Sequence, residues 1–222
     1  MQKLTIIAYH YIRPIKKSKF PLIKGLELES FKFQLDYLEK NYKFITMESL
    51  IDLAKTGKKI PNNSCLLTFD DGYKDHYLYV YPELKKRGIQ GSFFTVASTI
   101  LERKILDVNK IHFILAKESK TNLIIDDIKN LITEHKKNSD EVNNFDYYWN
   151  KYAVANKLDS KEIAFVKKIL QRGLPESLRL QFCTYLFERY VGRSEKEFAL
   201  ELYMSEIEIK EMIKSNMYFG SH

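Results

Sequence analysis

The sequence is poor in the residues that build loop-rich or cross-linked proteins. Its 222 residues include 8 glycines, 5 prolines and 2 cysteines. So few turn-forming residues argue against an all-β protein with many short loops, and they leave room for long helices. Both cysteines, Cys65 and Cys183, lie in apolar runs. This setting predicts buried thiols and excludes a small disulfide-stabilised scaffold.

Long hydrophobic runs are missing as well. No run approaches the roughly 18 apolar residues of a membrane-spanning helix. The apolar segment that follows Met1 is short and ends at the polar pair Tyr9-His10, whereas a secretory leader has a longer apolar region and a small-residue cleavage site. With Met1 as the true start, we expect a cytoplasmic protein, and the lysine- and isoleucine-rich composition fits a bacterium with an AT-rich genome.

The net charge of +7 is spread along the chain rather than clustered. Dispersed lysines predict a solvated surface, so we expect no nucleic-acid partner, while peripheral contact with a membrane stays open. A basic module that binds nucleic acid or another anionic partner is retained as an alternative, and a steep salt dependence of binding would support it.

Short apolar runs alternate with amphipathic stretches near both ends of the sequence. Buried strands are predicted at Leu4–Tyr11, Cys65–Phe69 and Gly91–Val96, with weaker candidates at Tyr42–Thr46 and Met217–Ser221. Strands that alternate with helices are typical of an α/β fold with a mainly parallel sheet.

Capping residues place the helices between these strands. Ser30 and Thr46 are expected to begin two helices, and Gly57 to end the second. A third helix is expected to begin near Pro82 and to end at Gly88.

Strand signals disappear in the middle of the chain. Residues 101–203 carry apolar residues at helical spacing, which predicts a helical insertion packed as its own small bundle. Pro175 and Gly192 are expected to bracket one of its helices. The sequence therefore divides into residues 1–100, the insertion, and residues 204–222, where a capping box formed by Ser205 and Glu208 opens a further helix.

Two adjacent carboxylates, Asp70 and Asp71, end the strand at Cys65–Phe69. The carboxyl edge of a parallel sheet is where α/β proteins build their sites. Adjacent residues of an extended segment point in opposite directions, so we expect one carboxylate to bind a metal and the other to face a water. An ordinary Asp-Asp-Gly turn, ending at Gly72, remains the alternative.

Two histidines follow strands that end at the same edge. His10 follows the first predicted strand, and His222 follows the last. A carboxylate together with imidazoles is a reasonable zinc environment with one position left for water. We expect His76, which lies a few residues after the carboxylates, to be solvated or to sit at a helix start.

The segment from Thr68 to Tyr73, Thr-Phe-Asp-Asp-Gly-Tyr, resembles the first motif of the polysaccharide deacetylase family of carbohydrate esterases. Gly220-Ser221-His222 resembles the opening of the second motif, and Tyr9-His10-Tyr11 resembles the first strand of one branch. The resemblance covers roughly residues 1–100 and 204–222. It implies part of a distorted (β/α) barrel into which the helical segment is inserted.

The same resemblance implies residue roles. Asp70 would be the catalytic base, and Asp71 and His222 would bind a divalent metal, with zinc expected. His10 and Tyr73 are expected to line the site or contact substrate. The implied reaction is N-deacetylation of a sugar in a polysaccharide, an oligosaccharide or its precursor, with release of acetate.

The resemblance also implies a third ligand, a histidine four positions after His222. An inactive, truncated fragment of such an enzyme is therefore a further alternative. A haloacid-dehalogenase-type phosphotransferase is less consistent with the sequence, because that chemistry needs two aspartates separated by one residue, whereas Asp70 and Asp71 are adjacent.

Overall fold

The structure, a computed structural model, describes residues 3–139 and 141–222. The chain folds into two compact units. A sheet unit comprises residues up to 19 together with 24–104 and 199–222, and a helical unit comprises residues 20–23 and 105–198. The division at residues 101 and 203 that the sequence indicates stays a prediction about domains.

The sheet unit is built on five parallel strands. They are β1 (Leu4–Tyr9), β4 (Lys43–Phe44), β5 (Ser64–Asp70), β6 (Gly91–Thr95) and β7 (Tyr218–Ser221). The order is β1-β5-β6-β7, and β4 pairs with the first residues of β5. A separate pair, β2 (Ile12–Arg13) and β3 (Leu26–Glu27), is also parallel. The predicted α/β fold with mainly parallel strands is confirmed, and the described strands form an open sheet rather than a closed barrel.

Helices connect these strands. They are α1 (Leu28–Asn41), α2 (Met47–Thr56), α3 (Tyr81–Arg87), α4 (Ala97–Leu101) and α11 (Glu206–Lys214), with shorter turns η1 (Ile15–Lys17) and η2 (His76–Val80). The cap of α2 is as predicted, because the Thr46 side chain accepts a hydrogen bond from Ser49 N and Gly57 adopts the left-handed conformation. The capping box of Ser205 and Glu208 is also present.

One predicted helix start is wrong. Helix α1 begins at Leu28, so Ser30 lies inside its first turn, and the capping position belongs to Glu27. The Glu27 carboxylate accepts hydrogen bonds from the backbone nitrogens of Ile15 and Lys16. These bonds anchor the start of the helix to a segment 11–12 residues earlier, beyond the three or four residues that a capping signal spans.

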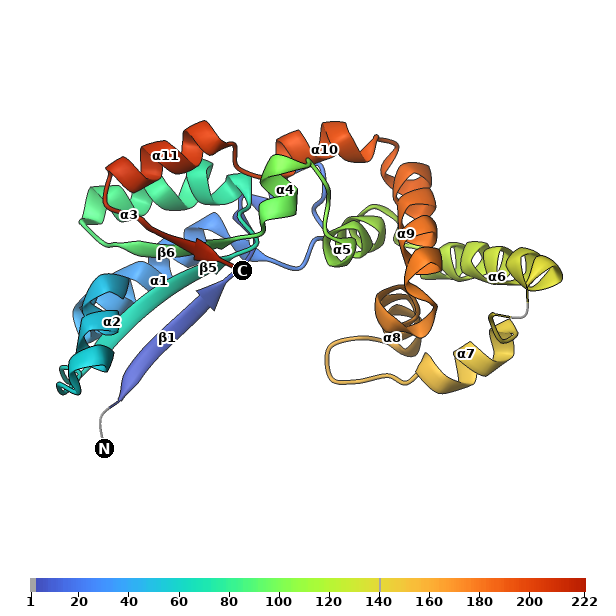
Figure 1. The fold of residues 1–222 in the computed structure, drawn as a ribbon, viewed down its shortest axis with the longest axis horizontal. Coiled ribbons are helices and arrows are strands. Elements are labelled where there is room, and N and C mark those ends of the chain that lie inside the picture. The colour runs from blue at the N-terminus through green and yellow to red at the C-terminus, as the bar shows by residue number, and fades with distance from the viewer. Residues whose placement is uncertain (1–2, 140) are drawn as a thin grey trace. The chain divides into compact units, whose positions relative to one another are not determined.

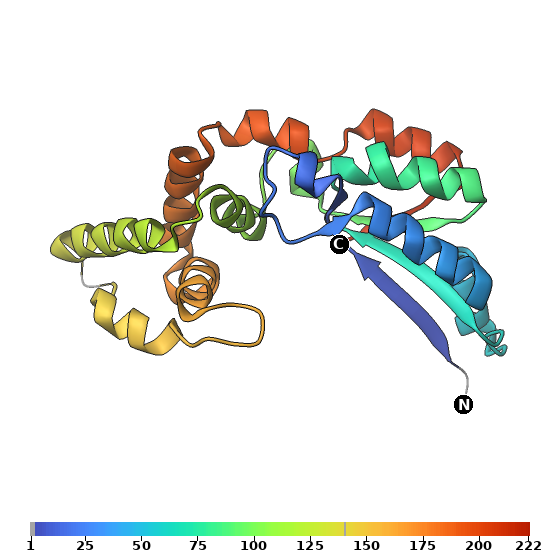
Figure 2. The same cartoon turned by 180° about the vertical axis from the view of Figure 1, so that it is seen from behind.

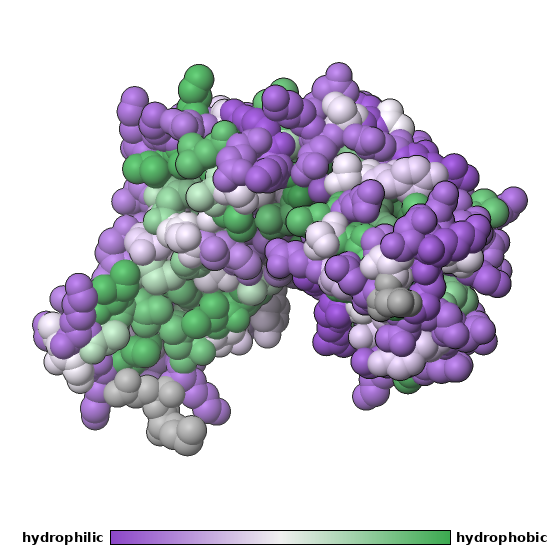
Figure 3. Space-filling model, turned by 45° about the vertical axis from the view of Figure 1, so that its right-hand side comes forward, coloured by the Kyte–Doolittle hydropathy of each residue, from purple (hydrophilic) through white to green (hydrophobic). Residues whose placement is uncertain are grey.

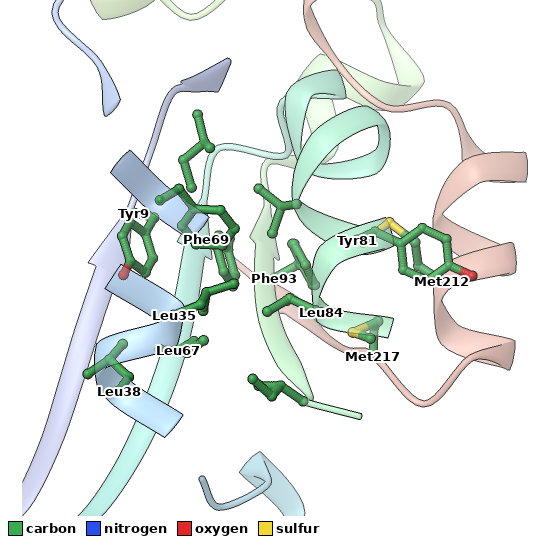
Figure 4. Packing of buried hydrophobic residues seen from close by; sticks show 14 of the residues in the cluster. Tyr9, Leu35, Leu38, Leu67, Phe69, Tyr81, Leu84, Phe93, Met212 and Met217 are labelled. Carbon is green, nitrogen blue, oxygen red and sulfur yellow. The ribbon is translucent and has the colours of Figure 1, made fainter. Parts of the chain in front are cut away.

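The core of the sheet unit lies between the sheet and its helices, which cover one face (Figures 1 and 2). Leu35 of α1, Phe69 of β5 and Phe93 of β6 are fully buried, and the rings of Phe69 and Phe93 stack at 4.8 Å (Figure 4). Hydrophobic residues also reach the surface of the molecule (Figure 3), and Ile6 of β1 is 55% exposed.

The helical unit has its own core. Its helices are α5 (Asp107–Lys117), α6 (Thr121–Asn138), α7 (Phe145–Tyr152), α8 (Lys161–Lys168), η3 (Ile169–Gly173), α9 (Glu176–Val191) and the first turn of α10 (Glu195–Leu202). Phe113, Phe165 and Phe187 are fully buried within it. Pro175 and Gly192 bracket α9 as predicted. Within the described ranges, no helix has both the length and the apolar character to cross a membrane.

The two ends of the helical unit are joined by a hydrogen-bond network. Ile105 N donates to the Glu195 carboxylate at 2.8 Å. The same carboxylate lies 3.2 Å from the ammonium group of Lys110, a buried lysine that also bonds Thr184. A buried charge needs such partners. This network therefore holds together the first residues of the unit, near Ile105, and its last helix, near Glu195.

Candidate active site at the carboxyl edge of the sheet

The predicted base Asp70, the predicted metal ligands Asp71 and His222, and the predicted site-lining residue His10 follow or end strands. They lie at the carboxyl edge of the sheet, where β1, β5 and β7 end (Figure 1). His10 follows β1, Asp70 ends β5 and is followed by Asp71, and His222 follows β7. Pairing continues to the last residue, since His222 N donates to Thr95 O at 2.9 Å. The parallel register therefore brings these side chains to one edge, as the sequence indicated.

The two carboxylates face different histidines. Asp70 Oδ2 is 3.9 Å from His10 Nε2, and Asp71 Oδ1 is 4.0 Å from His222 Nε2. The Asp70 side chain is 21% exposed and that of Asp71 is 9% exposed. Asp70 is thus the carboxylate that solvent or a ligand reaches more easily.

The opposite orientation of the two carboxylates has a different cause from the one expected. Strand β5 ends at Asp70, and Asp71 has φ 69°, which is left-handed rather than extended. Few non-glycine residues adopt this region, and aspartate is among those that tolerate it in turns. The backbone therefore forms the Asp-Asp-Gly turn that the sequence analysis kept as an alternative. This turn, not strand alternation, separates the two side chains.

Gly72 completes this turn in a conformation that suits glycine. Its φ is 72°, and a Cβ added to it would lie 2.9 Å from Cγ2 of Thr95 on β6. Its carbonyl oxygen accepts a hydrogen bond from Met204 N at 3.0 Å. The turn after β5 is therefore fixed by the neighbouring strand and by the segment that precedes α11.

His76 is a residue whose role the sequence analysis missed. It is fully buried, with its ring next to Phe69 and Phe93, so the prediction of a solvated side chain is wrong. The other part of that expectation, a helix start, is confirmed, because η2 begins at His76. Burial lowers the pKa of His76 to about 4, so the ring is neutral at pH 7. Its Nε2 lies 2.9 Å from His10 O, an acceptor, so this nitrogen carries the proton and fixes the backbone of His10.

Asp75, which directly precedes this histidine, forms a partly buried ion pair with Arg13. Arg13 Nε donates to Asp75 Oδ2 at 2.6 Å. Burial raises the pKa of Asp75 to about 6, although the Arg13 guanidinium acts in the opposite direction. The pair ties β2 to the segment that follows the carboxylates, and nothing in the local sequence pattern indicated it.

The donor types at Asp71 and His222 suit a divalent metal such as zinc. Bonds from zinc to carboxylate oxygen or imidazole nitrogen are about 2.0–2.2 Å, so two donor atoms 4.0 Å apart can reach one ion with little movement. In residues 3–139 and 141–222, no group of three or more His, Cys, Asp or Glu side chains is arranged to hold a metal.

Tyr73, expected to line the site, is fully buried. Its hydroxyl donates a hydrogen bond of 2.5 Å to Asp71 Oδ2. Tyr73 therefore contacts the site from the protein interior, through its bond to Asp71. The His10 side chain, by contrast, is 55% exposed and lies at the rim.

Comparison with known proteins tests the family resemblance that the sequence motifs indicate. The polysaccharide deacetylase family profile matches residues 57–222. YxkH of Bacillus subtilis (strain 168), whose name assigns it to the polysaccharide deacetylases, is 34% identical over 100 residues, which cover 44% of this chain and 33% of YxkH. The chain thus spans about a third of the length of this relative.

Two solved structures are also similar. A de-N-acetylase from Aggregatibacter actinomycetemcomitans is 25% identical over 44% of this chain and 38% of its own, with a TM-score of 0.38. IcaB from Ammonifex degensii is 26% identical over 52% of this chain and 50% of its own, also with a TM-score of 0.38. Because the family profile covers most of the sequence, including both motifs at the sheet edge, the chain belongs to the polysaccharide deacetylase family.

Proposed function

We propose that this chain provides the metal-binding and proton-accepting edge of an enzyme that removes acetyl groups from N-acetylated sugars in a polysaccharide, an oligosaccharide or its precursor. The observation that carries the proposal is the pair of adjacent carboxylates, Asp70 and Asp71, that face different histidines at one sheet edge. Such a pair can divide two tasks between neighbouring residues. Family membership supports the reaction class.

Asp71 and His222 would hold the metal. A bound divalent ion, with zinc proposed, supplies a Lewis acid for the acetamide carbonyl and lowers the pKa of a water it binds toward ~7. Asp71 suits the ligand role because its side chain is the less exposed of the two carboxylates and its Oδ1 points to His222.

Asp70 would accept the proton of the attacking water. Its side chain is partly exposed, and its Oδ2 lies towards His10 rather than His222. It can therefore stay free of the metal and receive a proton at the rim of the site. His76 bonds the backbone carbonyl of His10, and the His10 side chain lies 3.9 Å from Asp70. In this proposal His10 would contact the bound sugar at the rim of the site.

The test uses the full-length protein loaded with zinc and a panel of N-acetylated chitooligosaccharides and nucleotide sugars, with acetate release as the readout. Asp70→Asn should lower turnover by about 10²–10⁴-fold, the range typical of a general base, and should retain zinc. Asp71→Asn should lose both zinc and activity. Absence of acetate release by the zinc-loaded wild type, or full activity of Asp70→Asn, would overturn the proposal.

A further inference from the structure

The carboxylate of Asp71 is hydrogen-bonded to a buried side chain. The hydroxyl of Tyr73 donates to its Oδ2 at 2.5 Å, while its Oδ1 is the atom nearest to His222. The two oxygens of this carboxylate therefore have different environments, one buried and bonded, the other directed to the site.

Tyr73 has little freedom to move. Its ring stacks on Tyr11 at 4.2 Å between centroids and on Tyr203 at 6.0 Å, and both of these tyrosines are buried. The backbones of Tyr73 and Tyr203 form an isolated antiparallel bridge. The hydroxyls of Tyr11 and Tyr73 also hydrogen-bond each other. The donor to Asp71 is thus fixed by segments from three parts of the chain.

The hydroxyl of Tyr73 is directed at Asp71. A phenol hydroxyl has one proton to donate, and at Tyr73 the bond to Asp71 Oδ2 uses that proton. Tyr73 therefore acts on Asp71 as a hydrogen-bond donor.

We propose that Tyr73, supported by Tyr11, is a positioning residue that makes Oδ1 of Asp71 the metal-binding oxygen. A carboxylate without such a bond can ligate through either oxygen or through both. The bond to Oδ2 occupies one oxygen and leaves Oδ1 on the side of His222. Hydrogen bonds to metal ligands commonly contribute 10–100-fold to metal affinity. This inference rests on the proposed function, because it assumes that Asp71 is a metal ligand.

The experiment measures zinc affinity by competition with a chromogenic chelator, using the full-length protein. Tyr73→Phe removes only the hydroxyl and should weaken zinc binding about 10–100-fold. Tyr81→Phe is the matched control, since Tyr81 is also buried but its hydroxyl bonds Ser215, outside the site. This variant should bind zinc as the wild type does. With cobalt in place of zinc, the visible spectrum of Tyr73→Phe should change and that of Tyr81→Phe should not.

A zinc affinity of Tyr73→Phe within twofold of the wild type would overturn the positioning role. Should Tyr73→Phe fail to fold, Tyr11→Phe keeps the donor but removes its neighbour's hydroxyl. A several-fold loss of zinc affinity in that variant supports the proposal, and no loss overturns it. Failure of the proposed function looks different, because wild type and Asp71→Asn would then bind zinc equally or the zinc-loaded wild type would release no acetate.

Discussion

Replacing Gly72 by alanine should destabilise the sheet unit more than the same change at other left-handed glycines. Alanine in the left-handed region costs roughly 1–2 kcal/mol. At Gly72 the new methyl group would also lie 2.9 Å from Thr95 Cγ2, and overpacking of this kind costs roughly 1–3 kcal/mol. The expected loss in the free energy of unfolding is therefore about 2–5 kcal/mol.

Gly88→Ala separates these two contributions. Gly88 has φ 66°, close to the value at Gly72, but no atom lies within 4 Å of its added Cβ. It should lose only the conformational cost of about 1–2 kcal/mol. The double variant Gly72→Ala/Thr95→Ser removes the methyl group that the alanine meets, so it should recover about half or more of the excess loss.

The assay must resolve the two units, because two units can unfold in separate transitions. Native-state hydrogen exchange of the β5 and β6 amides reports the sheet unit. Fluorescence of Trp149, the one tryptophan of the sequence, reports the helical unit and should be unchanged. If Gly72→Ala is no less stable than Gly88→Ala, then contact with Thr95 does not restrict this turn.

Two further predictions concern the buried part of the sheet unit. The pKa of His76 falls on folding from 6.5 to about 4, so its contribution of about 3 kcal/mol is complete above pH ~6.5 and is lost as pH falls towards 4. In acid unfolding curves, the His76→Gln variant should not show this loss of stability. The opposite contribution of Asp75, whose pKa is raised, should persist in both proteins. If the stability of His76→Gln falls with pH in parallel with that of the wild type, the prediction is wrong. Phe93→Ala should lower the free energy of unfolding by about 3–5 kcal/mol in the hydrogen-exchange assay. Phe33→Ala, at a side chain that is 73% exposed, should change it by no more than about 0.5 kcal/mol. Similar losses in the two variants would refute the assignment of Phe93 to the core.

Local signals in the sequence were sufficient for much of the fold. The cap at Thr46 depends on a side chain and a backbone nitrogen three residues apart, so it is visible in a short window. The same is true of Ser205 and Glu208. The edge containing Asp70 and Asp71 was predictable because parallel strands end together.

Contacts between distant parts of the sequence were not predictable in this way. His76 bonds the backbone of His10, 66 residues earlier, and Arg13 pairs with Asp75 over 62 residues. Histidine, arginine and aspartate carry no local signal for burial, since these residue types are usually exposed or intermediate. A turn at Asp71 was kept as an alternative, but its left-handed backbone conformation was not predicted, because that conformation depends on what surrounds the turn.

The hydrogen bond between Ile105 and Glu195 has a consequence for the order of folding. Strand β7 must find β6 across a long stretch of chain, and Gly91 and Met217, which meet there, are 126 residues apart. Closing a long flexible loop costs entropy and slows folding. If the helical unit folds first, the joined ends replace most of that stretch by a short connection. A substitution that destabilises the helical unit would then slow the folding step that brings His222 close to Asp70 and Asp71, although it changes none of these three residues.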